Sequence, residues 1–81
     1  MTLNDLKSGE KAIITGVSQE IFGIERLKEL GLISGTEIKV IRYSPFNDLV
    51  MIYVRGSSLC IRLKDAKKIR VVKFEKDMSN R

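Results

Sequence analysis

The chain has 81 residues, of which 43% are hydrophobic and 31% charged, with a formal net charge of +5, one cysteine and no histidine. This length suits a single domain. The composition excludes an internal disulfide and any imidazole-based acid–base or nucleophilic catalysis. Residues 1–37 carry four Lys/Arg and six Asp/Glu, a net of −2, whereas residues 38–81 carry eleven and four, a net of +7.

The first part of the chain predicts a tucked-in turn followed by a curved strand. Residues 3–6 place two leucines around polar residues, which suits one turn. Residues 10–18 are apolar without clean alternation, which indicates a strand buried partly on both faces, as in a small barrel. Gly16 within it suits a bulge.

A two-turn helix is predicted over residues 23–30, with apolar side chains spaced three apart along one face. Gly31 then occupies the C′ position, where glycine adopts the left-handed conformation without a Cβ clash. Leu27 and Leu32 are the two positions that touch in a Schellman stop. A helix this short depends on packing against the rest of the domain.

The remainder predicts four more strands, separated by a loop at residues 45–48, a hairpin connection at residues 56–57 and a short turn at residues 64–66. The expected strands are residues 36–44, 49–55, 58–63 and 68–74. One domain over residues 1–74 would then precede a polar tail at residues 75–81. The whole pattern predicts a mostly β fold: a small SH3-like five-stranded barrel with one short helix between strands one and two. A five-stranded OB-type barrel is the structural alternative.

Three ordered pieces of the sequence resemble one family. Residues 26–40 read Arg-Leu-Lys-Glu-Leu-Gly-Leu-Ile-Ser-Gly-Thr-Glu-Ile-Lys-Val, which resembles the signature of FeoA, the small partner of the bacterial ferrous iron transporter FeoB. Residues 5–10 resemble the opening of that family, and residues 54–66 resemble its closing hairpin. The resemblance covers residues 3 to 72. It implies an SH3-like barrel, a link to transition-metal binding at family level, and a non-enzymatic accessory role on the cytoplasmic part of FeoB.

A tight metal site is not expected, and no cofactor is predicted. Ferrous iron prefers imidazole and carboxylate donors, and tetrahedral zinc sites use cysteine and histidine. With one cysteine and no histidine, only carboxylates remain, and none of them are paired in the sequence. Cys60 lies in the middle of a predicted strand and is interpreted as a small residue on a sheet face.

The helix and its stop are the main candidate for partner binding. A two-turn helix beside a barrel buries only part of its apolar surface, and the rest stays exposed for a partner. The alternative is that these leucines all face the core. The loop at residues 45–48, expected to lie near the helix, is a second candidate. The predicted partner-binding residues are Arg26, Leu27, Leu30, Leu32, Pro45 and Phe46.

A basic surface is predicted on the outer faces of the last strands, formed by Arg62, Lys64, Lys68 and Arg70. It could contact phosphates or place the module peripherally at an anionic membrane, or it could be an ordinary solvated exterior. The alternative function is that of a nucleic-acid-binding module, or of an SH3-like domain related to those of DtxR-type regulators. Against it, no helix-turn-helix that could read DNA precedes the barrel in this sequence. Weak self-association through open sheet edges is a further expectation. No apolar run approaches the ~20 residues of a membrane span, and no signal peptide is evident, which favours the cytoplasm.

Overall fold

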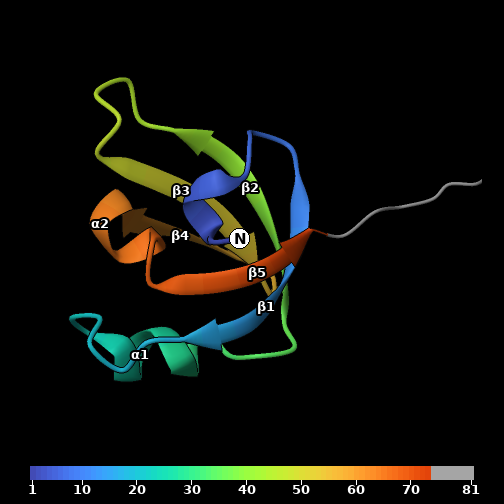
Figure 1. Ribbon diagram of the computed structural model, residues 1–81, viewed down its shortest axis with the longest axis vertical. Coiled ribbons are helices and arrows are strands. Elements are labelled where there is room, and N and C mark those ends of the chain that lie inside the picture. The colour runs from blue at the N-terminus through green and yellow to red at the C-terminus, as the bar shows by residue number, and fades with distance from the viewer. Residues whose placement is uncertain (74–81) are drawn as a thin grey trace, which may run out of the picture.

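Five antiparallel strands form one sheet in the order β4-β3-β2-β1-β5 (Figure 1). The computed structural model describes residues 1–73; the predicted tail at residues 75–81 and Phe74 lie outside them. The strands are β1 (Lys11–Val17), β2 (Glu37–Tyr43), β3 (Leu49–Val54), β4 (Ser57–Arg62) and β5 (Ile69–Lys73). The helices are the 3-10 turn η1 (Leu3–Asp5), α1 (Ile24–Glu29) and α2 (Leu63–Ala66).

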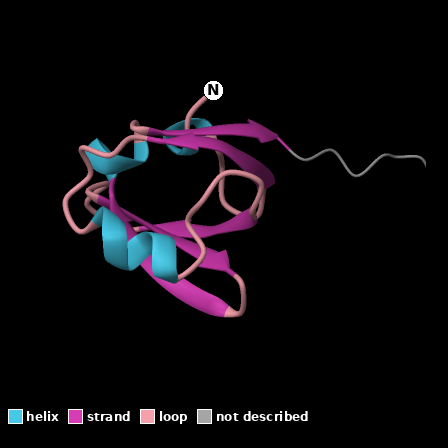
Figure 2. Ribbon diagram, turned by 90° about the horizontal axis from the view of Figure 1, so that it is seen from below, coloured by secondary structure: helices cyan, strands magenta, loops and turns pink. Residues whose placement is uncertain are grey.

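The sheet curls around its own core without closing into a continuous barrel (Figure 2). Among the described residues β4 and β5 are its two edges, and they do not pair with each other. The outer edge of β5 is partly covered by the N-terminus, because Thr2 bridges Arg70 and the Val71 N–H donates to the Met1 carbonyl at 3.0 Å. The prediction of a mostly β, five-stranded fold with a helix between the first two strands is confirmed, as an open sheet.

The core follows from strand alternation, since successive side chains point to opposite faces. Val50, Ile52 and Val54 on β3 are fully buried, as the alternation predicts, whereas Tyr53 between them faces solvent. The other strands contribute their inward residues to the same cluster, and the N-terminal turn closes it with two leucines. The largest fully buried side chains are Leu3, Ile14, Leu32, Ile38, Ile52, Ile69, Val40, Val50 and Val54.

Two irregularities in strand pairing bend the sheet. The β1–β5 register shifts between Ile14 and Gly16, which confirms the bulge predicted at the glycine. The β2–β3 register shifts between Val40 and Arg42. Because a bulge increases local twist and bends its strand, these two positions allow short strands to wrap a thin core.

Helix α1 ends in the predicted Schellman stop. The Leu32 N–H donates to the Leu27 carbonyl at 2.9 Å, and the Gly31 N–H donates to the Lys28 carbonyl at 3.0 Å. Gly31 has a φ of +110°, which L side chains rarely adopt. The stop turns the chain back under the helix and delivers Leu32 into the core.

The β3–β4 hairpin turns one residue earlier than the sequence predicts. Arg55 and Gly56 form the two-residue connection, with φ of +48° and +82°. A two-residue turn of the primed type requires positive φ at both central positions. An arginine is an unusual choice there, so the sequence favoured Gly56 and Ser57 instead.

The connection after β4 is a single helical turn rather than the predicted plain turn. Helix α2 begins at Leu63, which was expected to end the fourth strand. The Lys67 N–H donates to the Leu63 carbonyl at 3.3 Å, and the Lys68 N–H donates to the Asp65 carbonyl at 2.9 Å. The turn buries Ala66 and carries the chain from one sheet edge to the other.

Polar contacts fasten the N-terminal segment to the sheet. The Tyr43 hydroxyl donates to the Leu6 carbonyl, and burial, followed by the nearby Asp5 and Glu10 carboxylates, raises the pKa of that phenol. Glu10 accepts from the Lys7 backbone N–H at 2.8 Å and pairs with Lys73 Nζ at 2.6 Å. These contacts tie the turn before β1 to β5.

Candidate interaction surfaces

The segment between β1 and β2 presents apolar side chains to solvent on both sides of α1. Phe22, just before the helix, is 89% exposed, and Ile33, just after it, is also exposed. Arg26 is exposed on the helix, and Leu30 at its end is half-buried. We call Phe22, Arg26, Leu30 and Ile33 the helix surface. Exposed apolar side chains gathered in one short segment are typical of a contact site.

The predicted helix residues divide into core and surface. Leu27 is partly buried and packs against the core, whereas Leu30 is half-buried and does not belong to the core cluster. Leu32 is fully buried, so the expectation that it forms part of an exposed patch is wrong. The Schellman stop explains this position, because it folds the chain back directly after Gly31. Sequence reasoning missed Phe22 and Ile33, since both lie outside the helix predicted over residues 23–30.

The loop at residues 44–48 is exposed but lies far from α1. Phe46 is 88% exposed, and Pro45 is exposed beside it. However, α1 precedes the start of β2 and the loop follows its end, so the length of the strand separates them (Figure 1). Seven residues at about 3.3 Å each make roughly 20 Å. The expectation that this loop lies near the helix is therefore wrong.

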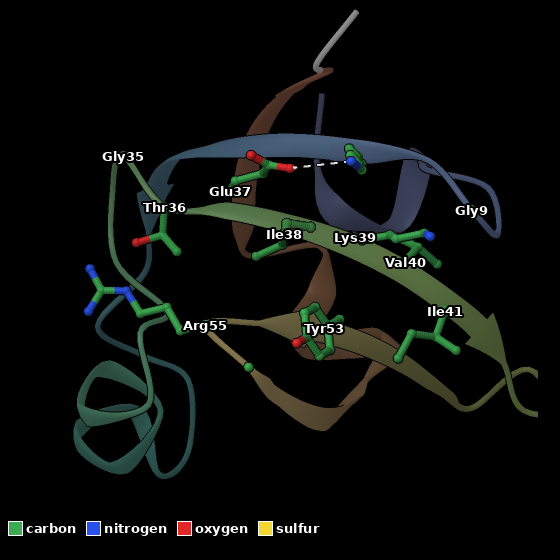
Figure 3. Close-up of a pocket in the computed structure, with 12 residues that line it drawn as sticks. Gly9, Gly35, Thr36, Glu37, Ile38, Lys39, Val40, Ile41, Tyr53 and Arg55 are labelled. Atoms are coloured by element: carbon green, nitrogen blue, oxygen red, sulfur yellow. Dashed lines mark ion pairs between the residues drawn. The ribbon is translucent and has the colours of Figure 1, made fainter. Parts of the chain in front are cut away.

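A groove of about 920 Å³ runs along the solvent face of β2, between β1 and β3 (Figure 3). Tyr53 stands at its centre, 48% exposed, with Arg55 towards one end and Ile41 towards the other. Strand alternation places Lys39 and Tyr53 as direct cross-strand partners. The lining residues are Gly9, Lys11, Gly35, Thr36, Glu37, Ile38, Lys39, Val40, Ile41, Tyr53, Arg55 and Gly56.

The groove is predominantly cationic. Lys11 and Lys39 face each other across the β1–β2 pairing, and like charges in that position repel. Glu37 lies within 3.9 Å of Lys11 through Oε2 and Nζ, which offsets one of these charges. In the part of the chain that the structure describes, Lys39 and Arg55 have no ion-pair partner. Uncompensated positive charge therefore flanks Tyr53: Arg55 lies towards one end of the groove, and the Lys39 ammonium extends from beside Tyr53 towards the Ile41 end (Figure 3).

The groove also holds a buried hydroxyl with no partner. Thr36 is only 7% exposed, and its Oγ1 is buried without a hydrogen bond within the described residues. Figure 3 shows this oxygen on the side of the threonine that faces the Arg55 guanidinium. An unsatisfied buried hydroxyl costs about 1–3 kcal/mol. Strand alternation could have revealed Lys39 and Tyr53 from the sequence, but this hydroxyl depends on tertiary packing.

The predicted basic residues are all exposed but do not form one surface. Arg62 and Lys64 line a shallow hollow together with Asp48. Arg70 instead lies over β1, where its guanidinium is 3.4 Å from the position that a Cβ on Gly16 would occupy. Lys68 is exposed in the turn before β5. The structure thus brings two of the four residues together, at the end of β4.

The donor chemistry offers no metal centre in the described part of the chain. No three His, Cys, Asp or Glu side chains gather within residues 1–73 in a way that could hold a metal ion. Cys60 is a free, exposed thiol on β4, opposite Met51. Among these residues there is also no helix with the length and apolar character that a membrane crossing requires.

Comparisons with known proteins point to one family. The family model described as the FeoA domain matches residues 1–73. A protein of Campylobacter jejuni assigned as Fe(2+) transport protein A is 37% identical over 71 residues, which is 88% of this chain and 96% of that relative. A fusion of Fe(2+) transport protein A with the Fe(2+) transporter FeoB, from Porphyromonas gingivalis, is 31% identical over 71 residues. That match is 88% of this chain and 8% of the fusion protein.

Solved structures give the same fold. The solution structure of FeoA from Chlorobium tepidum superposes with a TM-score of 0.87 at 35% identity, covering 96% of this chain and 74% of that one. FeoA from Stenotrophomonas maltophilia, solved with zinc and described as a prokaryotic SH3 domain protein, has a TM-score of 0.73 at 25% identity, with 89% of each chain covered. The SH3-like prediction is confirmed against the OB-type alternative.

A manganese-dependent transcriptional repressor shares the fold as well. It superposes with a TM-score of 0.78 at 14% identity, over 90% of this chain and 40% of the repressor. At that identity the likeness concerns the fold alone.

Proposed function

This chain belongs to the FeoA family, and from that premise we propose that it is a non-catalytic accessory protein of ferrous iron uptake, docking on the cytoplasmic part of a FeoB-type transporter. The observation that carries the proposal is the Porphyromonas gingivalis relative, in which the corresponding domain is fused to FeoB in one chain. Fusion into one chain keeps the FeoA domain and the transporter close together, at a high effective concentration, even if the two make no contacts of their own. A separate chain needs a binding surface of its own to achieve the same proximity.

The helix surface is the docking face that the geometry favours. Phe22 and Ile33 are exposed apolar side chains, and Leu30 is half-buried outside the core. Full burial of a large apolar side chain contributes about 1.5–3 kcal/mol. Two or three such anchors at the centre of an interface are enough to dominate its affinity. Arg26, which the sequence also proposes, is exposed on this face, and the partly buried Leu27 lies beneath it against the core.

Two other surfaces have secondary roles in this proposal. Pro45 and Phe46, at the far end of β2, would make a separate contact with the same large partner. The exposed basic residues, including Arg62 and Lys64, would orient the module near an anionic membrane face, at about 1 kcal/mol for each cation close to the surface. Iron is the cargo of the transporter in this account.

An NMR titration of the labelled protein with a soluble cytoplasmic part of FeoB tests the proposal. We expect amide shifts over residues 21–34, and we expect Leu30→Asp to weaken binding at least tenfold while its spectrum stays dispersed. Met51→Asp is the matched control, since that methionine is also half-buried and outside the core cluster but lies on β3. Normal binding by Leu30→Asp would show that the docking face is wrong. Binding to duplex DNA that falls steeply with salt, with no binding to FeoB, would favour the nucleic-acid alternative.

A further inference from the structure

The geometry points to a second binding site, in the groove over β2, for a short extended peptide that carries acidic side chains. The inference rests on the proposed function in that the peptide would be a segment of the same transporter partner. The groove is separate from the helix surface, and its recognition chemistry is charge and hydrogen bonding rather than apolar burial. Four features of its lining specify this occupant.

The first feature is length. The groove follows the chain from Gly35 into β2 as far as Ile41, which is seven residues. At about 3.3 Å per residue this is roughly 20 Å, the length of an extended peptide of about six residues. A compact ligand such as a single phosphate would contact only part of the lining.

The second feature is the charge arrangement. Lys11 and Lys39 repel each other across the β1–β2 pairing, and Glu37 offsets only the first. A carboxylate placed beside Lys39 would remove this repulsion and gain a charge-assisted hydrogen bond. The uncompensated positive charge of Lys39 therefore suits an anionic side chain of the peptide.

The third feature is the pairing of Thr36 with Arg55 at the other end. The buried Thr36 hydroxyl needs a hydrogen-bond partner, and a carboxylate oxygen accepts such a bond. The stem of Arg55 lies against Gly31, which places its guanidinium at this end of the groove. The guanidinium is a fork of N–H donors that matches a carboxylate. This end of the groove therefore suits a second acidic side chain.

The fourth feature is the apolar centre. Tyr53 is half-exposed, with the Arg55 guanidinium on one side and the Lys39 ammonium on the other, and Ile41 lines the groove at the Lys39 side (Figure 3). In an extended peptide, alternate side chains face the same side. The expected pattern is an acidic residue, an apolar residue two positions on, and a second acidic residue two positions further.

A nucleic acid fits the same lining less well. Its phosphates recur at every nucleotide, so one of them would meet the Glu37 carboxylate. Non-specific single-strand binding also relies on several aromatic platforms, whereas this groove offers Tyr53 alone. A peptide can place an uncharged residue against Glu37, and the spacing of its charges can follow the groove.

The test uses the full-length labelled protein and the peptide acetyl-Asp-Ser-Leu-Ser-Asp-Ser-amide, with the Asn-for-Asp peptide as control, in NMR titrations at low salt. We expect amide shifts confined to residues 35–41 and 53–56, and at least fivefold weaker binding of the Asn peptide. Lys39→Gln and Thr36→Val should each weaken binding of the acidic peptide at least threefold. The matched control Lys64→Gln, an exposed lysine outside the groove, should bind normally.

Equal binding of the two peptides, or shifts confined to residues 62–73, would overturn the inference. Displacement of the peptide by a short oligothymidine at lower concentration would also overturn it, in favour of a nucleic acid. Leu30→Asp should bind the peptide normally. A failure of the peptide experiment would therefore leave docking through the helix surface untouched, and a failure of docking to FeoB would leave the peptide result intact.

Discussion

The side chain of Arg55 lies directly across Gly31. A Cβ built on Gly31 would stand 2.7 Å from Arg55 Cδ, closer than real Cβ atoms come to a neighbour, and 3.2 Å from its Cγ, which is tighter than most real contacts. The glycine that ends α1 therefore also makes room for the arginine of the β3–β4 turn. The two segments are 24 positions apart in the sequence, and this contact joins the helix surface to the end of the groove.

Gly31→Ala should destabilise the protein by about 2–3 kcal/mol. Roughly 1 kcal/mol comes from placing an alanine at positive φ, and the remainder comes from displacing Arg55. Gly35→Ala is the matched control, because Gly35 has a φ of +93° and nothing within 4 Å of its Cβ position. Urea unfolding of both variants separates the two terms.

A second variant checks the assignment to Arg55. In the double variant Gly31→Ala with Arg55→Ala, the cost relative to Arg55→Ala alone should fall to that of Gly35→Ala. If Gly31→Ala and Gly35→Ala lower the free energy of unfolding by the same amount in the wild-type background, displacing Arg55 does not contribute to the loss of stability.

Thr36→Val should raise the free energy of unfolding by about 1 kcal/mol. The substitution keeps the shape of the side chain and removes a buried hydroxyl that has no partner. Thr15→Val on the exposed face of β1 is the control and should change stability by less than about 0.5 kcal/mol. A loss of stability in Thr36→Val, measured by urea unfolding, would mean that the hydroxyl is satisfied in the free protein. If Thr36→Val folds more stably but binds the acidic peptide less well, the Thr36 hydroxyl both lowers stability and contributes to peptide binding.

Leu32→Ala should cost about 2–5 kcal/mol, because this leucine is fully buried. Phe22→Ala and Phe46→Ala should each change stability by less than about 0.5 kcal/mol, since both rings are almost entirely exposed. The two phenylalanines are matched in type and exposure but lie at opposite ends of β2. If Phe22→Ala weakens docking to FeoB and Phe46→Ala does not, the helix surface is the principal face; the reverse result would transfer that role to residues 44–48.

Glu10→Gln should destabilise the protein at pH 7, with the difference from wild type shrinking in acid. Its hydrogen bond with Lys73, then that with the Lys7 backbone N–H, lowers the pKa of the Glu10 carboxyl. A carboxyl with a lowered folded-state pKa stabilises the fold above its unfolded pKa, and this contribution is lost as pH falls through the folded value. Urea unfolding of both proteins at pH 7 and pH 3 measures the effect. A difference for Glu10→Gln that persists at pH 3 would contradict the pairing with Lys73.

The sequence was sufficient wherever local chemistry decides the structure. The helix stop at Gly31 depends on φ and on hydrogen bonds within six residues, so the pattern around it predicts the geometry correctly. Alternation in residues 49–55 likewise predicts which side of β3 is buried. The bulge at Gly16 belongs to the same class, because glycine tolerates the local bend.

The candidate sites depend on contacts between distant segments, and there the sequence was insufficient. Leu32 was predicted to belong to an exposed patch because a two-turn helix leaves part of its apolar surface uncovered, yet the reversal of the chain after Gly31 buries it. The separation of Phe46 from α1 depends on the direction of β2. The unpartnered hydroxyl of Thr36 depends on packing that no spacing rule reports.

The pairing of β1 with β5 also has a kinetic consequence. Strands β2, β3 and β4 follow one another through short connections, so they can form as a local meander. In contrast, Val17 pairs with Ile69, which lies 52 positions further along the chain. Closing so long a loop costs entropy before its contacts stabilise anything. We therefore expect the docking of β5 to be the late, rate-setting event of folding, so that during synthesis the domain matures only after its last strand has left the ribosome.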